Sequence, residues 1–186
     1  MDAFLLILLG AILVMGAVLV RRHYAEFYGQ APEDYEDVDP VFDLRQHLKG
    51  DMVCEGVIFG PMGRVTTTFA ADFKITWDGD KGVMAERFRY SDGSTQDRCW
   101  HITLGDGGHF WTEAEDVPHG GRGRLSGHAV QMLYSIKLPE TSGGHLLRTV
   151  DWMYLTPDGS IMNRSQFRKF GFKVAELVAT IRPKTA

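Results

Sequence analysis

The chain has 186 residues and a formal net charge of −4 at pH 7, a size that corresponds to one ordinary domain with a short appendage. Hydrophobic residues make up 44% and charged residues 24%, which excludes a disordered chain, and the absence of a basic excess argues against nucleic-acid binding. Two cysteines and seven scattered histidines give no disulfide framework and no zinc-binding spacing. We therefore expect no metal and no cofactor.

An uninterrupted apolar segment begins the chain. Residues 3–20 carry no charge, and as a helix they would be about 27 Å long, close to the roughly 30 Å hydrocarbon core of a bilayer. The segment is apolar all round, unlike the amphipathic helix of a soluble domain. A cleavable secretory signal is the main rival, but no positive charge precedes the segment and no small-residue cleavage site follows before Arg21. Residues 1–22 are thus predicted to be a single-pass transmembrane helix, with the lipid membrane as a partner.

The charges beside this helix predict the side of the membrane. Arg21 and Arg22 follow the apolar segment, and positive residues favour the cytoplasmic side. The rest of the chain is therefore expected in the cytoplasm.

Residues 23–40 are acidic and are predicted to form a tether. They contain six acidic residues, two prolines and no lysine or arginine, a composition that buries too little surface to offset the entropy of ordering. Residues 41–49 follow, with Phe42, Leu44 and Leu48 among polar residues and a glycine after them, which indicates one short helix. We take 41–186 as the folded domain and this helix as its first element.

Alternation of apolar and polar residues dominates the chain after residue 53. In the clearest case, residues 65–77 place apolar side chains on one face and mostly polar ones on the other, the pattern of a half-buried strand. Asp-Gly pairs begin at Asp78, Asp92, Asp106 and Asp158, and this dipeptide favours tight hairpin turns. Eight or nine antiparallel strands are expected, near 53–59, 63–77, 82–90, 95–104, 108–115, 122–138, 145–155, 160–167 and 171–183.

These strands predict an all-β fold. The first three Asp-Gly pairs are fourteen residues apart, which means long strands joined by short turns in a meander. Closing such a sheet removes its exposed edges, and a barrel of about eight strands can hold side chains or one small ligand. We expect an up-and-down, lipocalin-like β-barrel. A two-sheet sandwich is the alternative, although its turns usually come every eight to twelve residues.

Several motifs resemble those of one bacterial family, the domain of unknown function 3833 family. They are FDLRQHLKG (42–50), GPMGRV (60–65), WDGD (77–80), FRYSDGS (88–94), RCWHI (98–102), AEDVPHGGRGRLSGHA (114–129), DWMYLTPDG (151–159), NR (163–164) and KFGFKVAE (169–176). The resemblance implies a lipocalin-like barrel on small envelope proteins of Gram-negative bacteria, many of them lipoproteins. This chain departs from that pattern, because no Cys stands at the end of its apolar segment, and we expect its helix rather than a lipid to hold it in the bacterial inner membrane. The exported relatives imply the periplasmic side, opposite to the side that the charges favour.

Charged and aromatic residues on apolar strand faces are the candidate ligand-binding residues. Arg98 and Trp100 share the face that should point into the barrel, and a charge there is costly unless it is paired. Asp151 lies on the inward face of its own strand and could pair with Arg98, as could Glu86 or Asp116. An arginine in an apolar pocket could hold a carboxylate or an anionic headgroup. An ion pair that closes one barrel end, with Trp100 packed over Arg98, is the structural alternative.

Two aromatic residues on the apolar faces of other expected strands, Trp77 and Tyr134, complete the candidate site. The favoured function is a membrane-anchored barrel that binds a hydrophobic or amphipathic ligand, a lipid or fatty-acid derivative, in envelope lipid handling. One alternative is a barrel filled by its own side chains that serves as an interaction module of a membrane complex. A lipid-modifying enzyme is the less favoured alternative, and the sequence contains no Gly-x-Ser-x-Gly nucleophile motif.

Overall fold

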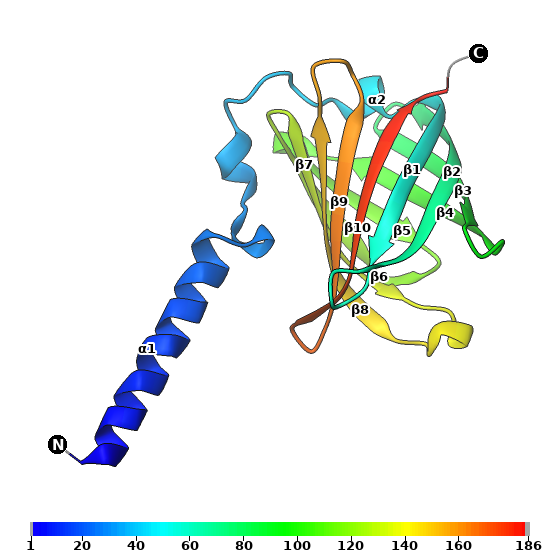
Figure 1. The fold of residues 1–186 in the computed structure, drawn as a ribbon. Coiled ribbons are helices and arrows are strands. Elements are labelled where there is room, and N and C mark those ends of the chain that lie inside the picture. The colour runs from blue at the N-terminus through cyan, green and yellow to red at the C-terminus, as the bar shows by residue number, and fades with distance from the viewer. Residues whose placement is uncertain (1, 185–186) are drawn as a thin grey trace.

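The computed structural model describes residues 2–184, with the side chains of Arg22 and Thr141 left out, and shows a closed antiparallel β-barrel beside one long helix (Figure 1). Each strand pairs with the next along the chain, and the first pairs with the last, so the lipocalin-like barrel expected from the sequence is confirmed. The strands are β1 Gly50–Phe59, β2 Val65–Asp78, β3 Lys81–Tyr90, β4 Thr95–Leu104, β5 His109–Ala114, β6 Val117–Ser126, β7 Ala129–Lys137, β8 Leu146–Leu155, β9 Ile161–Lys169 and β10 Phe172–Pro183.

Ten strands form the barrel rather than the expected eight or nine. The strand expected over 122–138 is in fact two strands, β6 and β7, joined by a tight turn at Gly127 and His128. Gly127 has φ +51°, a conformation that glycine adopts without steric cost. The turn was missed because the apolar alternation continues on both sides of it and no Asp-Gly pair marks it. The four Asp-Gly pairs do lie at turns, each with its glycine at positive φ.

A short helical segment closes one end of the barrel. The helix α2, Leu44–His47, lies within the expected range 41–49, and Asp43 caps it by accepting a hydrogen bond from the Arg45 backbone N–H. Phe42, Leu44 and Leu48 are each at most 2% exposed and pack into the main core cluster. We call this end the lid end and the opposite end, formed by the β1–β2, β3–β4, β5–β6, β7–β8 and β9–β10 turns, the far end (Figure 1).

The acidic segment 23–40 is not the solvated tether that its composition predicted, because it packs against the outside of the barrel. It contains two 3-10 turns, η1 Phe27–Gly29 and η2 Pro32–Tyr35. Phe27 and Tyr35 pack with Trp152, which is completely buried on the outer face of β8. Arg124 of β6 also pairs with two glutamates of the segment. Burial of its few aromatic side chains thus stabilises the packed segment more than solvation of its charges favours a free one, because aromatic side chains bury large apolar surfaces.

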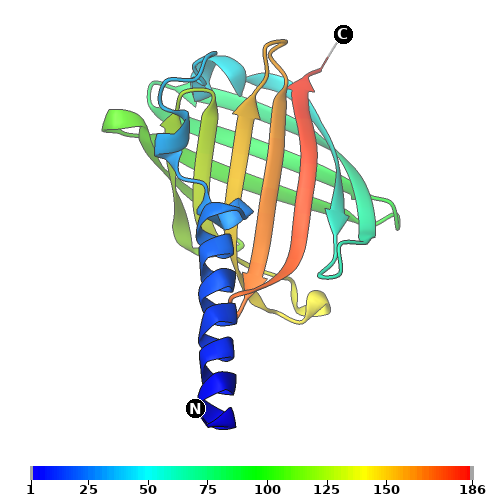
Figure 2. The ribbon, with the colours of Figure 1, turned by 60° about the vertical axis from the view of Figure 1, so that its left-hand side comes forward.

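The apolar helix α1, Ala3–Tyr24, projects away from the barrel (Figure 2). All its side chains from Ala3 to Val20 are exposed, so none is used to build the core. It is long and apolar enough to cross a membrane, although a signal sequence has the same properties. Its N-terminal half extends past the far end of the barrel, as both views show.

The lid segment gives a first prediction. Phe42→Ala should lower the free energy of unfolding by about 3–5 kcal/mol, because it empties a fully buried aromatic site. Val41→Ala is the matched control, since Val41 is 66% exposed and its removal should cost less than about 0.5 kcal/mol. Urea unfolding of the full chain in detergent, followed by intrinsic fluorescence, measures both. Equal losses would show that the segment does not seal the barrel.

Candidate ligand site in the barrel interior

An ion pair joins β4 to the turn between β5 and β6. Arg98 of β4 donates from Nε to Asp116 Oδ1 at 3.0 Å, and the two side chains are only 13% and 21% exposed. The guanidinium carbon lies 4.2 Å from the centre of the Trp100 ring, within the range of a cation–π interaction. Tyr134 stacks edge-on against Trp100 at 5.3 Å. The charge of Arg98 is therefore held by one carboxylate and two aromatic rings.

Asp151 forms the second half of the polar cluster, on the inward face of β8. Its carboxylate accepts hydrogen bonds from Ser165 Oγ at 2.8 Å and from Asn163 Nδ2 at 2.5 Å, and a longer one from Tyr134 at 3.4 Å. Burial raises the pKa of Asp151, and the bonds from Ser165 and Asn163 oppose that shift. Tyr134 thus bridges the Arg98 side of the interior and the Asp151 side.

Glu86 is buried opposite Arg98 on the neighbouring strand. The two residues are register partners in the β3–β4 ladder, so both side chains point to the same face. Burial raises the pKa of Glu86 to about 8, although the charge of Arg98 opposes the shift. The side chain is therefore mostly protonated at neutral pH. Six buried side-chain polar atoms of the described residues have no hydrogen-bond partner, and two of them, Glu86 Oε2 and Arg98 Nη2, belong to residues that line an interior cavity.

A cavity of about 100 Å³ adjoins these two atoms inside the barrel. Its polar lining comes from Glu86, Arg98, Asp151 and their partners. Its apolar lining consists mainly of phenylalanine and methionine side chains: Phe69, Phe73, Phe88, Phe167, Met84, Met132 and Met153. The volume is below the roughly 300–1,000 Å³ of typical small-molecule pockets. The interior is thus largely filled by its own side chains, around a small polar space.

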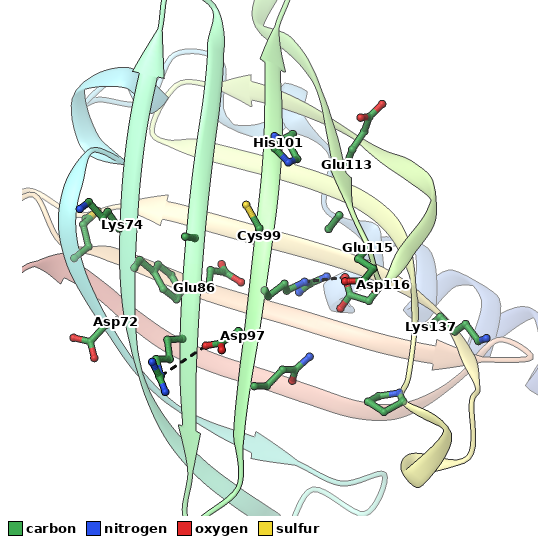
Figure 3. Close-up of a pocket in the computed structure, with 18 of the residues that line it drawn as sticks. Asp72, Lys74, Glu86, Asp97, Cys99, His101, Glu113, Glu115, Asp116 and Lys137 are labelled. Carbon is green, nitrogen blue, oxygen red and sulfur yellow. Dashed lines mark hydrogen bonds and ion pairs between the residues drawn. The ribbon is translucent and has the colours of Figure 1, made fainter.

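The interior cavity and a surface groove share lining residues at a seam in the wall. The described β4–β5 ladder covers only the four residues His101–Leu104 of β4, so residues 95–100 lie beyond it. A groove of about 1120 Å³ lies along the outer wall here, between the outward side chains of β2–β4 and the segments 113–118 and 137–140 (Figure 3). Groove and cavity share Phe73, Glu86 and Arg98 in their linings. The ion pair to Asp116 spans the seam between them (Figure 3).

The structure brings together four of the five residues that the sequence singled out, namely Arg98, Trp100, Tyr134 and Asp151. Trp77 lies elsewhere: its Nε1 donates to the Leu48 carbonyl oxygen at 2.8 Å, which fastens the lid segment. Asp151 does not pair with Arg98 directly, because Asp116 occupies that position.

Sequence reasoning offered Glu86 only as a possible partner of Arg98 and Asn163 only as part of a motif, and it did not single out Ser165. Glu86 interrupts the apolar inward face of β3 between Met84 and Phe88, and that interruption was the available signal. Asn163 and Ser165 point inward from β9, but neither residue type is unusual in a strand. Their role becomes visible only through their hydrogen bonds to Asp151.

The chain belongs to the DUF3833 family of proteins of unknown function, whose model matches residues 23–183. The match includes the acidic segment that packs on the barrel as well as all ten strands. No curated protein matches the sequence.

Three solved structures share the barrel. The S-type phycobiliprotein lyase CpeS from Guillardia theta has 8% identity and a TM-score of 0.56, over 77% of this chain and 92% of that one. Rv2717c from M. tuberculosis has 13% identity and a TM-score of 0.54, over 80% and 100%. A DUF3598-family protein of unknown function from Nostoc punctiforme has 13% identity and a TM-score of 0.53, over 78% and 51%. At these identities the similarity concerns the fold alone.

The buried carboxyl of Glu86 gives a second prediction. Its pKa is about 8 in the folded chain and about 4.5 in the unfolded chain, so the folded state holds the extra proton between these values. The free energy of unfolding must then fall as the pH rises through this window. Glu86→Gln removes the effect and should be more stable than the wild type by about 1–3 kcal/mol at pH 8, with little difference at pH 4.5.

Urea unfolding at a series of pH values measures this difference. Asp97→Asn is the matched control, because Asp97 lies on the outer face of the adjacent strand and is 77% exposed. A stability difference between Glu86→Gln and the wild type that stays constant from pH 4.5 to 8 would contradict the raised pKa.

Proposed function

We propose that this protein is a membrane-tethered barrel that binds an amphipathic ligand, a lipid or fatty-acid derivative, with the polar group of the ligand held by Arg98 and Glu86. This activity would belong to envelope lipid handling. The observation that carries the proposal is the pair of buried polar atoms without partners, Arg98 Nη2 and Glu86 Oε2, beside a cavity. Unpaired buried polar groups are costly, so their retention favours a partner that binds there.

The hydrogen-bonding capacity of the two atoms defines the ligand group. Arg98 can only donate, and a protonated Glu86 can also donate, so together they suit a carboxylate or carbonyl oxygen. Asp116 already neutralises part of the charge of Arg98, which favours a group with at most one negative charge. Ionisation of Glu86 above pH 8 would repel an anionic ligand, so binding should weaken there.

The apolar lining suits the remainder of such a ligand. Methionine side chains are unbranched and polarisable, and they repack around ligands more readily than β-branched residues. Met84, Met132 and Met153 all line the cavity, together with phenylalanines. An acyl chain would therefore enlarge the small cavity by displacing these side chains. The seam between β4 and the segment 113–118 is the entry route that the groove provides.

One observation favours the alternative of a barrel that binds nothing and acts as an interaction module. The interior is nearly filled, and Arg98 already has a carboxylate partner, so the cluster could be purely structural. An enzyme has less support, since none of the described residues that line the interior cavity is a histidine. His101 and Glu113 lie in the outer groove instead.

The exposed apolar side chains of α1 support anchorage in a membrane. A helix that buries none of its apolar surface in the protein has a strong driving force to enter lipid. We place the barrel on the cytoplasmic side, because Arg21 and Arg22 follow the helix. A short path joins helix and barrel, since η1 follows directly and packs on β8.

Co-purified lipid is the third prediction. Native mass spectrometry of the full chain from its host should show a mass above that of the protein alone, which denaturation and lipid extraction then identify. Arg98→Gln should reduce the occupied fraction about tenfold, since a charged hydrogen bond contributes about 1.5–3 kcal/mol.

Arg87→Gln is the matched control for this experiment. Arg87 lies on the outer face of β3 and pairs only loosely with Asp97, at 3.7 Å, so its loss should leave the ligand in place. A wild-type protein that runs at its bare mass would reject ligand binding and leave the interaction module. Equal occupancy in both variants would reject Arg98 as the ligand-binding residue.

The native cysteines give the fourth prediction, which concerns the side of the membrane on which the barrel lies. Cys99 is exposed, whereas Cys54 is buried and its pKa is raised to about 12 by burial and nearby carboxylates, so Cys99 alone should react. A membrane-impermeant maleimide should label one thiol only after spheroplasts are permeabilised. Labelling of intact spheroplasts would place the barrel in the periplasm, and a membrane-extracted chain lacking residues 1–22 would identify a cleaved signal.

A further inference from the structure

Large apolar side chains are exposed at the far end of the barrel. Phe170 is 89% exposed, Met62 is 86% exposed and Phe172 is 77% exposed, and Val65 and Leu146 are also exposed. They lie in or beside the β1–β2, β7–β8 and β9–β10 turns. We call these five residues the far-end patch. The core does not use their side chains, and exposed apolar clusters usually mark an interaction site.

Phe170 occupies a backbone position that does not suit it. It has φ +52°, and it is the only non-glycine residue at positive φ in the described chain. Bulky residues rarely adopt this conformation, which glycine or asparagine would satisfy at this turn. The turn thus presents a phenylalanine to solvent at a local cost and without a packing role in the fold. A contact outside the protein would explain it.

Basic residues surround the patch. The segment from Arg164 to Lys173 contains four basic residues and no acidic one, although Arg164 and Lys173 pair with Glu176. Among the described residues, Arg64 and Lys169 form no ion pair with a carboxylate. Lys169 instead contacts His145 Nδ1 at 2.9 Å, which joins two of the turns, and lies 5.5 Å from the centre of the Phe170 ring. Apolar tips flanked by two positive charges without a countercharge match an anionic bilayer surface, where each basic residue adds attraction.

The patch also lies on the side of the molecule toward which α1 extends. The N-terminal half of α1 runs past the far end, as Figures 1 and 2 both show. Arg168 ties the β9–β10 turn to the segment after α1, because it donates to the Gly171 carbonyl oxygen at 2.9 Å and lies 4.3 Å from the centre of the Tyr28 ring. The turn that carries Phe170 is therefore held near the membrane-proximal end of the chain.

We propose that the far-end patch is a second membrane-contact site, at which Met62, Phe170 and Phe172 insert into the interface of an anionic bilayer while Arg64 and Lys169 contact its headgroups. The proposal rests on the anchorage of α1 proposed above. It adds a fixed orientation: the far end of the barrel faces the lipid and the lid end faces water. The seam and its groove then open beside the bilayer, the source of the proposed ligand.

Nitroxide labels on the full chain test this orientation. Single cysteines replace Phe170, Met62, Val41 or Leu13 in a Cys99→Ser background, since Cys54 is buried. The protein is reconstituted in vesicles of 70:30 phosphatidylcholine and phosphatidylglycerol, and power saturation compares the accessibility of each label to oxygen and to a nickel chelate. Labels at 170 and 62 should show an oxygen-to-nickel ratio several-fold above that at 41, an exposed position at the lid end. Leu13 reports the insertion of α1.

The outcomes separate the two proposals. A lipid-exposed label at 13 with water-exposed labels at 170 and 62 would overturn the second contact and leave the anchor, whereas water exposure at all three would overturn both. Labels at 170 that are shielded from both reagents and broadened by one another would assign the patch to a second copy of the chain. Arg64→Glu with Lys169→Glu should lower the ratio at 170 several-fold, and an unchanged ratio would overturn the headgroup contacts.

Discussion

A guanidinium inside an apolar barrel imposes the constraint on which the rest of this structure depends. Arg98 lies where β4 loses its β5 partner, so side chains rather than backbone hydrogen bonds join the wall at this point. Asp116 supplies the countercharge from the far side of the seam. Removing either partner would leave a charge of low exposure uncompensated, which is more costly than replacing both. The same pair therefore completes the wall where the β4–β5 ladder ends.

One part of the outer barrel surface is covered by the segment after α1, and another part is open and carries the groove. The segment after α1 covers the outer face of β7 and β8, where Trp152 is fully buried beneath it. The outer face of β2–β4 stays uncovered and forms the groove. Because the segment after α1 packs on β7 and β8, and the seam lies beside β4, this segment leaves the seam uncovered. The lid segment closes the lid end with three buried apolar side chains, so the proposed function has the ligand enter at the seam.

Local patterns in the sequence were enough to predict the barrel. Alternation and Asp-Gly turns specify strands one at a time, and a long meander has few ways to bury its edges. Four of the five candidate residues lie together, and they could be singled out because a charge or a large aromatic side chain on an apolar face needs a partner. The packing of residues 23–40 on the barrel could not be predicted from such local patterns. One signal was present in β8, where Val150 and Trp152 on one face and Asp151 on the other are all buried, so some segment has to cover the outer face of this strand. The seam depends on which residues pair across strands, and that is a property of the closed barrel.

Buried polar atoms without hydrogen-bond partners are the feature that favours the proposed ligand-binding barrel over a barrel filled by its own side chains. A purely structural cluster tends to satisfy every member, as Asp151 is satisfied by Ser165, Asn163 and Tyr134. The Arg98 side departs from that rule. Arg98 and Glu86 are register partners on neighbouring strands, yet Arg98 Nη2 and Glu86 Oε2 have no hydrogen-bond partner. A protonated carboxyl beside a charged guanidinium offers two donors to the adjoining cavity, which has room for one small group. The asymmetry between the two halves of the cluster is the reason why the proposed function assigns the polar end of a ligand to the seam and its apolar end to the methionine-lined interior.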